Sequence, residues 1–179
     1  MQLEAAGKLI ATQPQRAAES IAKAQGLARE SLAEVRRSVA ALRASPLDTA
    51  ALGEAIGEVV ENLRASGIAT TFTIEGEVHP LPIQIRTALY RAAQEGLTNV
   101  RKHASAGAAQ VTLTYEPERV MLTVGDNGIG RRGKKAEGFG LLGLRERVAS
   151  LGGSLEAGDR PEGGFRLQIV VPTEERDDA

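Results

Sequence analysis

Four polar side chains on one predicted helix have the types and the spacing of a phosphate and metal site. The helix is predicted from residue 83 to about residue 103, and Glu95 and Asn99 are one helical turn apart on it. The amide oxygen of Asn99 can coordinate Mg²⁺, a cation that prefers oxygen ligands and usually bridges a protein to phosphates. The basic pair Lys102 and His103 follows on the next turns of the same flank and can contact phosphate oxygens. Glu95 can accept a proton from a nucleophile or orient a water.

A glycine-rich turn follows the next apolar strand, in the sequence Asp126-Asn-Gly128-Ile-Gly130. The carboxylate of Asp126 can accept a hydrogen bond from an amino group. Glycines at positions 128 and 130 allow the backbone to approach a flat ring such as adenine. Turns of this composition occur in proteins of every function, so the pattern gains its meaning from the helix before it.

A second glycine-rich segment, Gly138-Phe-Gly140-Leu141-Leu-Gly143, opens another predicted helix. Free backbone amides and the positive end of the helix dipole can face phosphates there. The segment lacks the Gly-Lys-Ser/Thr ending of a Walker loop. Four basic residues lie between the two glycine-rich segments and could close over phosphates, although a solvated loop is equally compatible with them. Together the three clusters predict an ATP site, whereas a solvated helix flank remains the alternative for the helix residues taken alone.

Composition limits the class of protein before any motif is considered. The chain has 179 residues, of which 42% are hydrophobic and 25% charged, which suits one good-sized domain with an appendage. With a net charge of −1, the overall charge gives no indication of binding to nucleic acid or to membrane surfaces, so any basic patch is local. The sequence contains no cysteine, so disulfides, thiolate metal sites and cysteine nucleophiles are excluded. No apolar run approaches the length of a membrane span, and the first residues do not match a signal peptide.

The organisation changes near Ser45-Pro46. Residues 21–42 carry apolar side chains at alternating steps of three and four, which is the spacing of a helix-bundle seam. A shorter helical segment precedes it and is interrupted at Pro14. We therefore predict a partial helical hairpin at residues 1–45, a separate domain at residues 46–173 and a flexible tail at residues 174–179.

Residues after Pro46 alternate between helix and strand patterns. Helices are predicted at residues 52–63, 83–103 and 141–151, and strands at residues 68–75, 111–115, 120–124, 154–157 and 165–171. The turn Glu116-Pro117-Glu118 predicts that the second and third strands form an antiparallel hairpin. The predicted fold class is α+β, a two-layer α/β sandwich with a mixed sheet of about five strands and about three helices.

The order and the chemistry of these clusters resemble the ATP-binding domain shared by sensor histidine kinases, DNA gyrase B, the heat-shock chaperone of that class and the mismatch-repair ATPase. The stretch Glu95-Gly-Leu-Thr-Asn99-Val-Arg-Lys-His-Ala is similar to the N box of that superfamily, and the two glycine-rich segments are similar to its glycine boxes. The second box continues into Leu-Arg-Glu-Arg, which is similar to the nitrate-sensor and desaturase-sensor subfamily of two-component kinases. The resemblance implies a Bergerat-type fold and covers nearly the whole chain.

The resemblance also implies a role for each matching residue, with ATP and Mg²⁺ as cofactors. Glu95 would be the general base and Asn99 the Mg²⁺ ligand. Asp126 would hold the adenine amino group. The other implied nucleotide contacts are Lys102, His103, Gly128, Gly130, Gly138, Gly140, Leu141 and Gly143. One departure is Phe165, which follows Gly163-Gly164 where many relatives have a threonine in the adenine network.

A second departure concerns the acceptor histidine. The chain contains two histidines, His79 in a predicted surface loop and His103 on the nucleotide helix, and neither is on the predicted hairpin. The resemblance therefore implies a C-terminal fragment that does not phosphorylate itself. The resemblance assigns dimerisation and phosphotransfer to the hairpin at residues 1–45 and ATP-binding catalysis to residues 46–173. In the complete protein it implies a homodimer formed through the hairpin and a response regulator with a helix-turn-helix output domain. For the fragment it implies a cytoplasmic location without contact to nucleic acid or membrane.

Two other classes remain open. A stand-alone serine kinase of the same superfamily, of the type that controls anti-sigma factors, has the same ATP site, but it needs no phosphotransfer hairpin. A dimerisation module with a degenerate ATP site has the hairpin, but it does not need Glu95, Asn99 and Asp126 together. Nucleotide titration separates binding from structural roles, and the genomic context of the gene separates the two kinases.

Overall fold

The computed structural model describes residues 14–18, 21, 25, 47, 51–130 and 139–173. The chain divides into two compact units, Met1–Ser45 and Pro46–Ala179. In the first unit, residues 14–18, 21 and 25 are helical, and Ala17 is buried. The rest of the predicted hairpin lies outside the described residues, as do the basic loop, Gly138 and the tail after residue 173. Within the described part, no helix combines the length and the apolar composition needed to cross a membrane.

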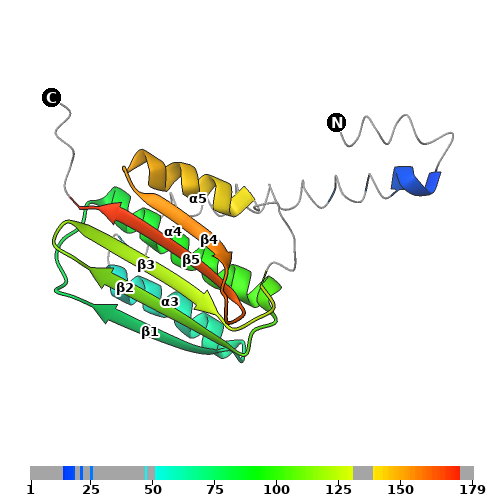
Figure 1. The fold of residues 1–179 in the computed structure, drawn as a ribbon, viewed down its shortest axis with the longest axis horizontal. Coiled ribbons are helices and arrows are strands. Elements are labelled where there is room, and N and C mark those ends of the chain that lie inside the picture. Colours follow the sequence, from blue (N-terminus) through cyan, green and yellow to red (C-terminus); the bar gives the residue numbers. More distant parts are fainter. Residues whose placement is uncertain are drawn as a thin grey trace. The chain divides into compact units, whose positions relative to one another are not determined.

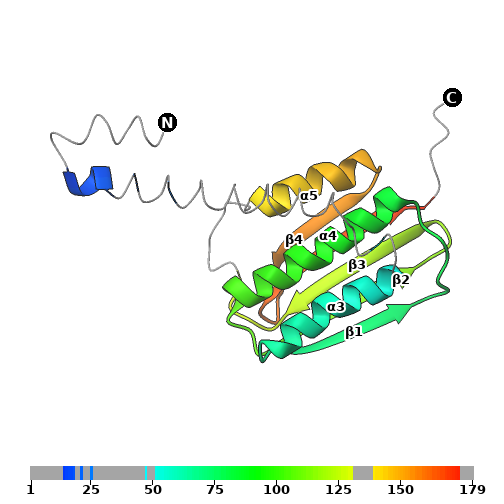
Figure 2. The ribbon, with the colours of Figure 1, turned by 180° about the vertical axis from the view of Figure 1, so that it is seen from behind.

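The second unit contains a five-stranded sheet with its described α-helices on one face (Figure 1). Its elements are α3 (Leu52–Ala65), β1 (Ala69–Glu75), α4 (Ile83–Asn99), the π-helix η2 (Val100–Ala104), β2 (Ala108–Tyr115), β3 (Arg119–Asp126), α5 (Phe139–Ser150), β4 (Ser154–Asp159) and β5 (Phe165–Pro172). The strand order is β1-β2-β3-β5-β4, with β1 and β2 parallel and every other neighbouring pair antiparallel. Figure 2 shows α3, α4 and α5 side by side over the sheet. The predicted two-layer sandwich with a mixed sheet is confirmed.

Strand alternation determines which side chains enter the core. In β2, Val111, Leu113 and Tyr115 are buried, whereas the residues between them are only partly covered. Leu113 pairs with Leu122 across the antiparallel ladder, and the amide of Glu116 donates to the carbonyl of Arg119 at 2.9 Å to close the turn. The hairpin predicted from the alternation of residues is therefore present. Its register is fixed because a slip of one residue would move the buried apolar side chains of a strand to the exposed face of the sheet.

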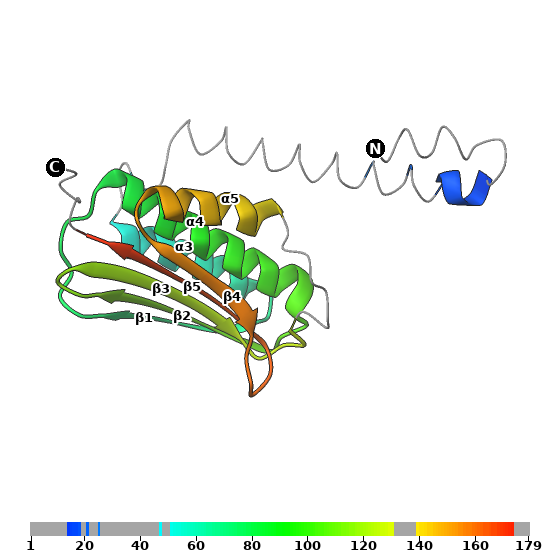
Figure 3. The same ribbon diagram turned by 45° about the horizontal axis from the view of Figure 1, so that its top comes forward.

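The first helix of this unit begins and ends where local chemistry predicts. In α3 the amide of Ala51 donates to the carboxylate of Glu54 at 3.2 Å, which satisfies one free amide at the start of the helix. The helix ends before Gly67, whose φ of 89° is unfavourable for other residues. Gly96 lets α4 approach the sheet closely, because a Cβ atom there would lie 3.0 Å from Cβ of Val124. Buried residues of all three α-helices and of the strands form one core between the helices and the sheet. Figure 3 shows the three helices on the same face of the sheet.

The structure differs from the sequence prediction in the last turn of the nucleotide helix. One α-helix was predicted to about His103, but α4 ends at Asn99 and the next five residues form η2. A π-helical turn bonds each amide to the carbonyl five residues back instead of four, so it changes the direction of the side chains that follow. Short π segments of this kind occur mostly inside or at the ends of α-helices and frequently at functional sites.

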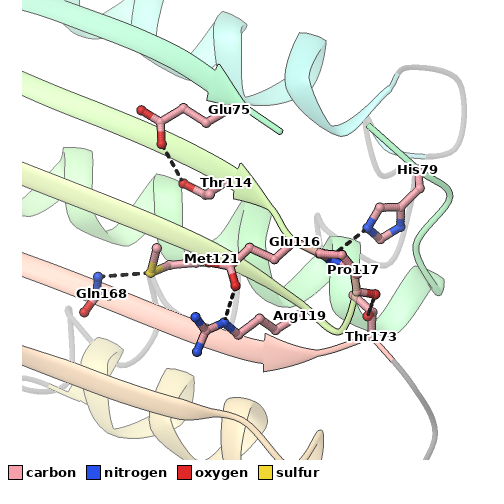
Figure 4. Close-up of polar contacts among 9 residues, drawn as sticks. All are labelled: Glu75, His79, Thr114, Glu116, Pro117, Arg119, Met121, Gln168 and Thr173. Atoms are coloured by element: carbon pink, nitrogen blue, oxygen red, sulfur yellow. Dashed lines mark hydrogen bonds and ion pairs between the residues drawn. The ribbon is translucent and has the colours of Figure 1, made fainter. Parts of the chain in front are cut away.

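The opposite end of the sheet is fixed by polar contacts around the β2–β3 turn (Figure 4). Nε2 of His79 lies 3.3 Å from the carbonyl oxygen of Glu116, and its ring meets Tyr115 edge-on with centroids 5.4 Å apart. The hydroxyl of Thr173 donates to the carbonyl of Pro117 at 3.1 Å. His79, predicted to be a surface histidine in a loop, is partly buried, because it lies against Glu116 and Tyr115. Burial also raises the pKa of the Tyr115 phenol.

Candidate functional site

The best-defined polar group of the site is the carboxylate of Asp126, the last residue of β3. The residue is only 4% exposed, and the sheet register places it beside Ala109 of β2. Oδ1 accepts a hydrogen bond from the amide of Gly128 at 2.7 Å. Among the described residues, Oδ2 has no hydrogen-bond partner. A buried carboxylate oxygen without a donor is costly, so this oxygen is suited to accept a hydrogen bond from a ligand.

The glycines after Asp126 are required by close packing on two sides. The amide of Ile129 donates to the carbonyl of Ala104 at 2.8 Å, and a Cβ atom at Gly128 would overlap that same carbonyl oxygen. Gly130 has a φ of 63°, and a Cβ atom there would lie 2.7 Å from the carboxylate of Asp159. The turn therefore lies between the end of η2 and the hairpin that joins β4 to β5. Glycines were expected here from the sequence so that the backbone could approach a flat ring. The structure adds a second reason, since a side chain at either position would clash with a neighbouring segment.

Glu95 and Asn99 form a pair on one flank of α4. Both side chains are partly buried, and Nδ2 of Asn99 donates to Oε1 of Glu95 at 3.3 Å. This hydrogen bond leaves the amide oxygen of Asn99 as the atom that can coordinate a cation. The start of α5 lies against the same pair, because a Cβ atom at Gly140 would overlap the carboxylate of Glu95. The structure thus brings the first cluster and the second glycine-rich segment together across 45 sequence positions.

The other predicted nucleotide contacts lie in different surroundings from Glu95 and Asn99. Lys102 and His103 are exposed on η2, after the change in helix direction. The side chain of Leu141 is buried in the core, so only its backbone could contact a nucleotide. Gly143 is exposed, and a Cβ atom there would meet nothing within 4 Å. Gly138 lies outside the described residues.

The hairpin between β4 and β5 supports the site. Its Gly163-Gly164 pair was noted in the sequence only as a departure from relatives, and no residue of the hairpin was among the predicted contacts. A Cβ atom at Gly164 would overlap the carbonyl oxygen of Asp126, so the hairpin backbone contacts the strand end directly. Nη1 of Arg160 lies 3.5 Å from that carbonyl, and Nε of Arg160 donates to Glu162 at 2.9 Å. This hydrogen bond lowers the pKa of the Glu162 carboxyl. The pair Gly163-Gly164 was the signal in the sequence, since consecutive glycines in a hairpin mark positive φ or close approach.

The described residues contain no group of three His, Asp or Glu side chains that could hold a metal by themselves. A Mg²⁺ ion at Asn99 would therefore take most of its ligands from phosphate oxygens and water, which is its usual mode in nucleotide sites. A groove of about 830 Å³ lies at the ends of β1, β2 and β3 and is lined by Arg64, Asn127 and Arg160, among others. Glu95, Asn99 and Gly140 do not line it, so this groove is separate from the contact between α4 and α5.

The fold and the site together define a Bergerat-type nucleotide-binding domain. The family described as histidine kinase-, DNA gyrase B- and HSP90-like ATPase matches residues 84–175, and the family described as histidine kinase matches residues 1–47. The chain belongs to the family of histidine kinase-, DNA gyrase B- and HSP90-like ATPases. The second match concerns the segment in which the sequence predicted a helical hairpin.

The curated relatives are sensor histidine kinases. The chain is 31% identical over 154 residues to the sensor histidine kinase LnrJ of Bacillus subtilis, covering 86% of this chain and 38% of LnrJ. It is 39% identical over 141 residues to the histidine-protein kinase/phosphatase UhpB of Salmonella typhimurium, covering 77% of this chain and 28% of UhpB. It is 32% identical over 171 residues to the sensor histidine kinase DesK of Bacillus subtilis, covering 93% of this chain and 44% of DesK. The predicted resemblance to this subfamily is confirmed, and the chain spans less than half the length of these relatives.

Solved structures agree on the fold. The histidine kinase domain of the Erythrobacter litoralis blue-light activated histidine kinase has a TM-score of 0.54 and 22% identity, covering 68% of this chain and 65% of that domain. The nucleotide-free catalytic domain of histidine kinase ThkA also has a TM-score of 0.54, with 18% identity, covering 68% of this chain and 93% of that one. Both family matches and the relatives name histidine kinases, so the serine kinase alternative gains no support of its own.

Proposed function

We propose that this chain is the ATP-binding catalytic part of a two-component sensor histidine kinase. The complete protein transfers the γ-phosphoryl group of ATP to a histidine and from there to an aspartate of a response regulator. The single observation that carries the nucleotide assignment is Oδ2 of Asp126, a buried acceptor with no donor among the described residues. The 6-amino group of adenine is the donor that this oxygen lacks.

The phosphate end of the nucleotide is assigned to the pair on α4. Asn99 holds Mg²⁺ through its amide oxygen, and the hydrogen bond from Nδ2 of Asn99 to Glu95 fixes the orientation of that amide. When bound, the ion neutralises charge on the phosphates during transfer. Glu95 polarises the nucleophile or a water. Lys102 and His103 contact phosphate oxygens, and Gly138, Gly140, Leu141 and Gly143 supply backbone around the triphosphate.

The rest of the proposal concerns partners and location. The histidine kinase family match to residues 1–47 supports a homodimer formed through this segment in the complete protein. A response regulator is the partner implied by two-component sensor kinases, and we assign it a helix-turn-helix output domain. We place the chain in the cytoplasm, where ATP and such a regulator are available, and we propose a domain division at residues 1–45, 46–173 and 174–179.

Replacing Asn99 by alanine is expected to abolish the Mg²⁺ dependence of nucleotide binding. Wild-type chain should bind a non-hydrolysable ATP analogue about 10- to 100-fold more tightly with Mg²⁺ than with EDTA, because the amide oxygen and the phosphates share the ion. Calorimetric titration in both buffers measures the ratio for Asn99→Ala and for the exposed control Asn62→Ala on α3. A variant that keeps the wild-type ratio would contradict the role of Asn99.

Phosphotransfer is tested with ATP labelled in its γ-phosphate. The present chain is expected to acquire no phosphohistidine, because His79 packs against Tyr115 at the far end of the sheet and His103 belongs to the nucleotide helix. A longer form of the protein that carries the hairpin histidine should become labelled, and Asn99→Ala in that form should prevent labelling. Acid-labile, base-stable phosphate identifies phosphohistidine. Phosphate on serine of a partner protein would instead support the anti-sigma-factor type of kinase.

A further inference from the structure

Asn127 makes three hydrogen bonds that join the end of β3 to the start of β2. Its side-chain oxygen Oδ1 accepts from the amide of Gly107 at 3.1 Å and from the amide of Ala108 at 2.9 Å. Its own amide donates to the carbonyl of Ala108 at 3.2 Å. Most exposed side-chain amides bond to water, whereas the oxygen of Asn127 accepts from two backbone amides at the start of β2.

The segment that Asn127 holds is the turn between η2 and β2. This turn contains Ser105, whose φ of 48° makes it the one non-glycine residue with positive φ among the described residues. Left-handed backbone at a residue with a side chain is unfavourable and persists only where surrounding contacts impose it. Those contacts include the bonds from Gly107 and Ala108 to Asn127 and the bond from Ile129 to the carbonyl of Ala104.

We propose that Asn127 is a positioning residue for the phosphate end of the nucleotide, an inference that rests on the proposed function. The strained turn follows directly after Lys102 and His103, so its conformation determines where η2 ends. Asp126 is adjacent to Asn127 in sequence, and it is held separately by its pairing with Ala109 and by the amide of Gly128. Asn127 therefore fixes the distance between the adenine acceptor Asp126 and the phosphate-binding side chains of Lys102 and His103.

The test compares a ligand that uses both ends with one that uses only the adenine end. Asn127→Leu keeps the side-chain size and removes the acceptor, whereas Asn127→Asp keeps an acceptor at the same position. Binding of the Mg²⁺ complex of an ATP analogue and of adenosine is measured by NMR titration of each variant. Asn127→Leu is expected to lower affinity for the ATP analogue about tenfold and to change affinity for adenosine less than about threefold. Asn127→Asp should remain within about threefold of wild type for both ligands.

Controls separate positioning from stability. Thermal unfolding of the nucleotide-free variants gives the folded fraction, and Asn62→Leu on the exposed side of α3 gives the effect of a new surface leucine. Asn127→Ala carries the same test without a bulky apolar side chain if the leucine variant does not fold. Equal losses for both ligands, or unchanged affinities with reduced stability, would overturn the positioning role. Wild-type chain that binds neither ligand would overturn the proposed function and the positioning role together.

Discussion

Asp126→Ala is expected to lower the affinity for ATP about 10- to 100-fold, because a hydrogen bond to a buried charged acceptor contributes about 1.5–3 kcal/mol. The carboxylate is buried, one oxygen is bonded to Gly128, and the other is available to the adenine amino group. The affinity for inorganic triphosphate should stay unchanged, since that ligand has no base. Competition titrations with ATP, GTP and triphosphate measure the three affinities.

Asp126→Asn is the matched control for this prediction. The amide keeps the size of the side chain and can still accept from Gly128, but its nitrogen donates where the carboxylate accepted. The preference for ATP over GTP should therefore fall in Asp126→Asn, because an amide nitrogen can donate to the 6-oxo group of guanine. Equal weakening of ATP, GTP and triphosphate in both variants would show that Asp126 does not contact the base.

Gly164→Ala is expected to reduce the free energy of unfolding by about 3 kcal/mol or more, the largest effect on stability that we predict. Gly164 has a φ of 84°, and a Cβ atom there would overlap the carbonyl oxygen of Asp126 and lie 3.1 Å from Cα of Asn127. The neighbouring atoms are backbone, so they cannot move without displacing the end of β3. The variant should therefore also bind ATP more weakly, because the displaced residue is the adenine acceptor.

Gly163→Ala provides the comparison within the same turn. Gly163 has a φ of 97°, but a Cβ atom there would meet nothing within 4 Å. Gly163→Ala should lower the free energy of unfolding by only about 1–2 kcal/mol, which is the cost of left-handed backbone at an alanine. Urea unfolding of both variants measures the difference, which isolates the contact between the hairpin and Asp126. Equal losses of stability in the two variants would contradict that contact.

The sequence by itself determined the elements whose information is local. Alternation in residues 111–124 predicted the β2–β3 hairpin, and the apolar stripe ending before Gly67 predicted α3. The position of Asp126 at a strand end, and the spacing of Glu95 and Asn99 on one helix flank, were also predictable from periodicity. The types of these residues sufficed to indicate a nucleotide site and a family, because amide, carboxylate and glycine each supply a distinct contact.

Only the tertiary structure decided which of these parts touch. The start of α5 at Gly140 lies against Glu95, and the hairpin at Gly164 lies against Asp126, although each pair is far apart in the sequence. The change from α4 to η2 was also not predicted from periodicity, and η2 ends at Ala104, whose carbonyl lies against the turn at Gly128. Periodicity records which side of an element is buried, but not which distant backbone atom occupies the space beside it. Close approach between remote segments is a property of the packed chain, and the hydrogen bonds from Gly107 and Ala108 to Asn127 are of the same kind.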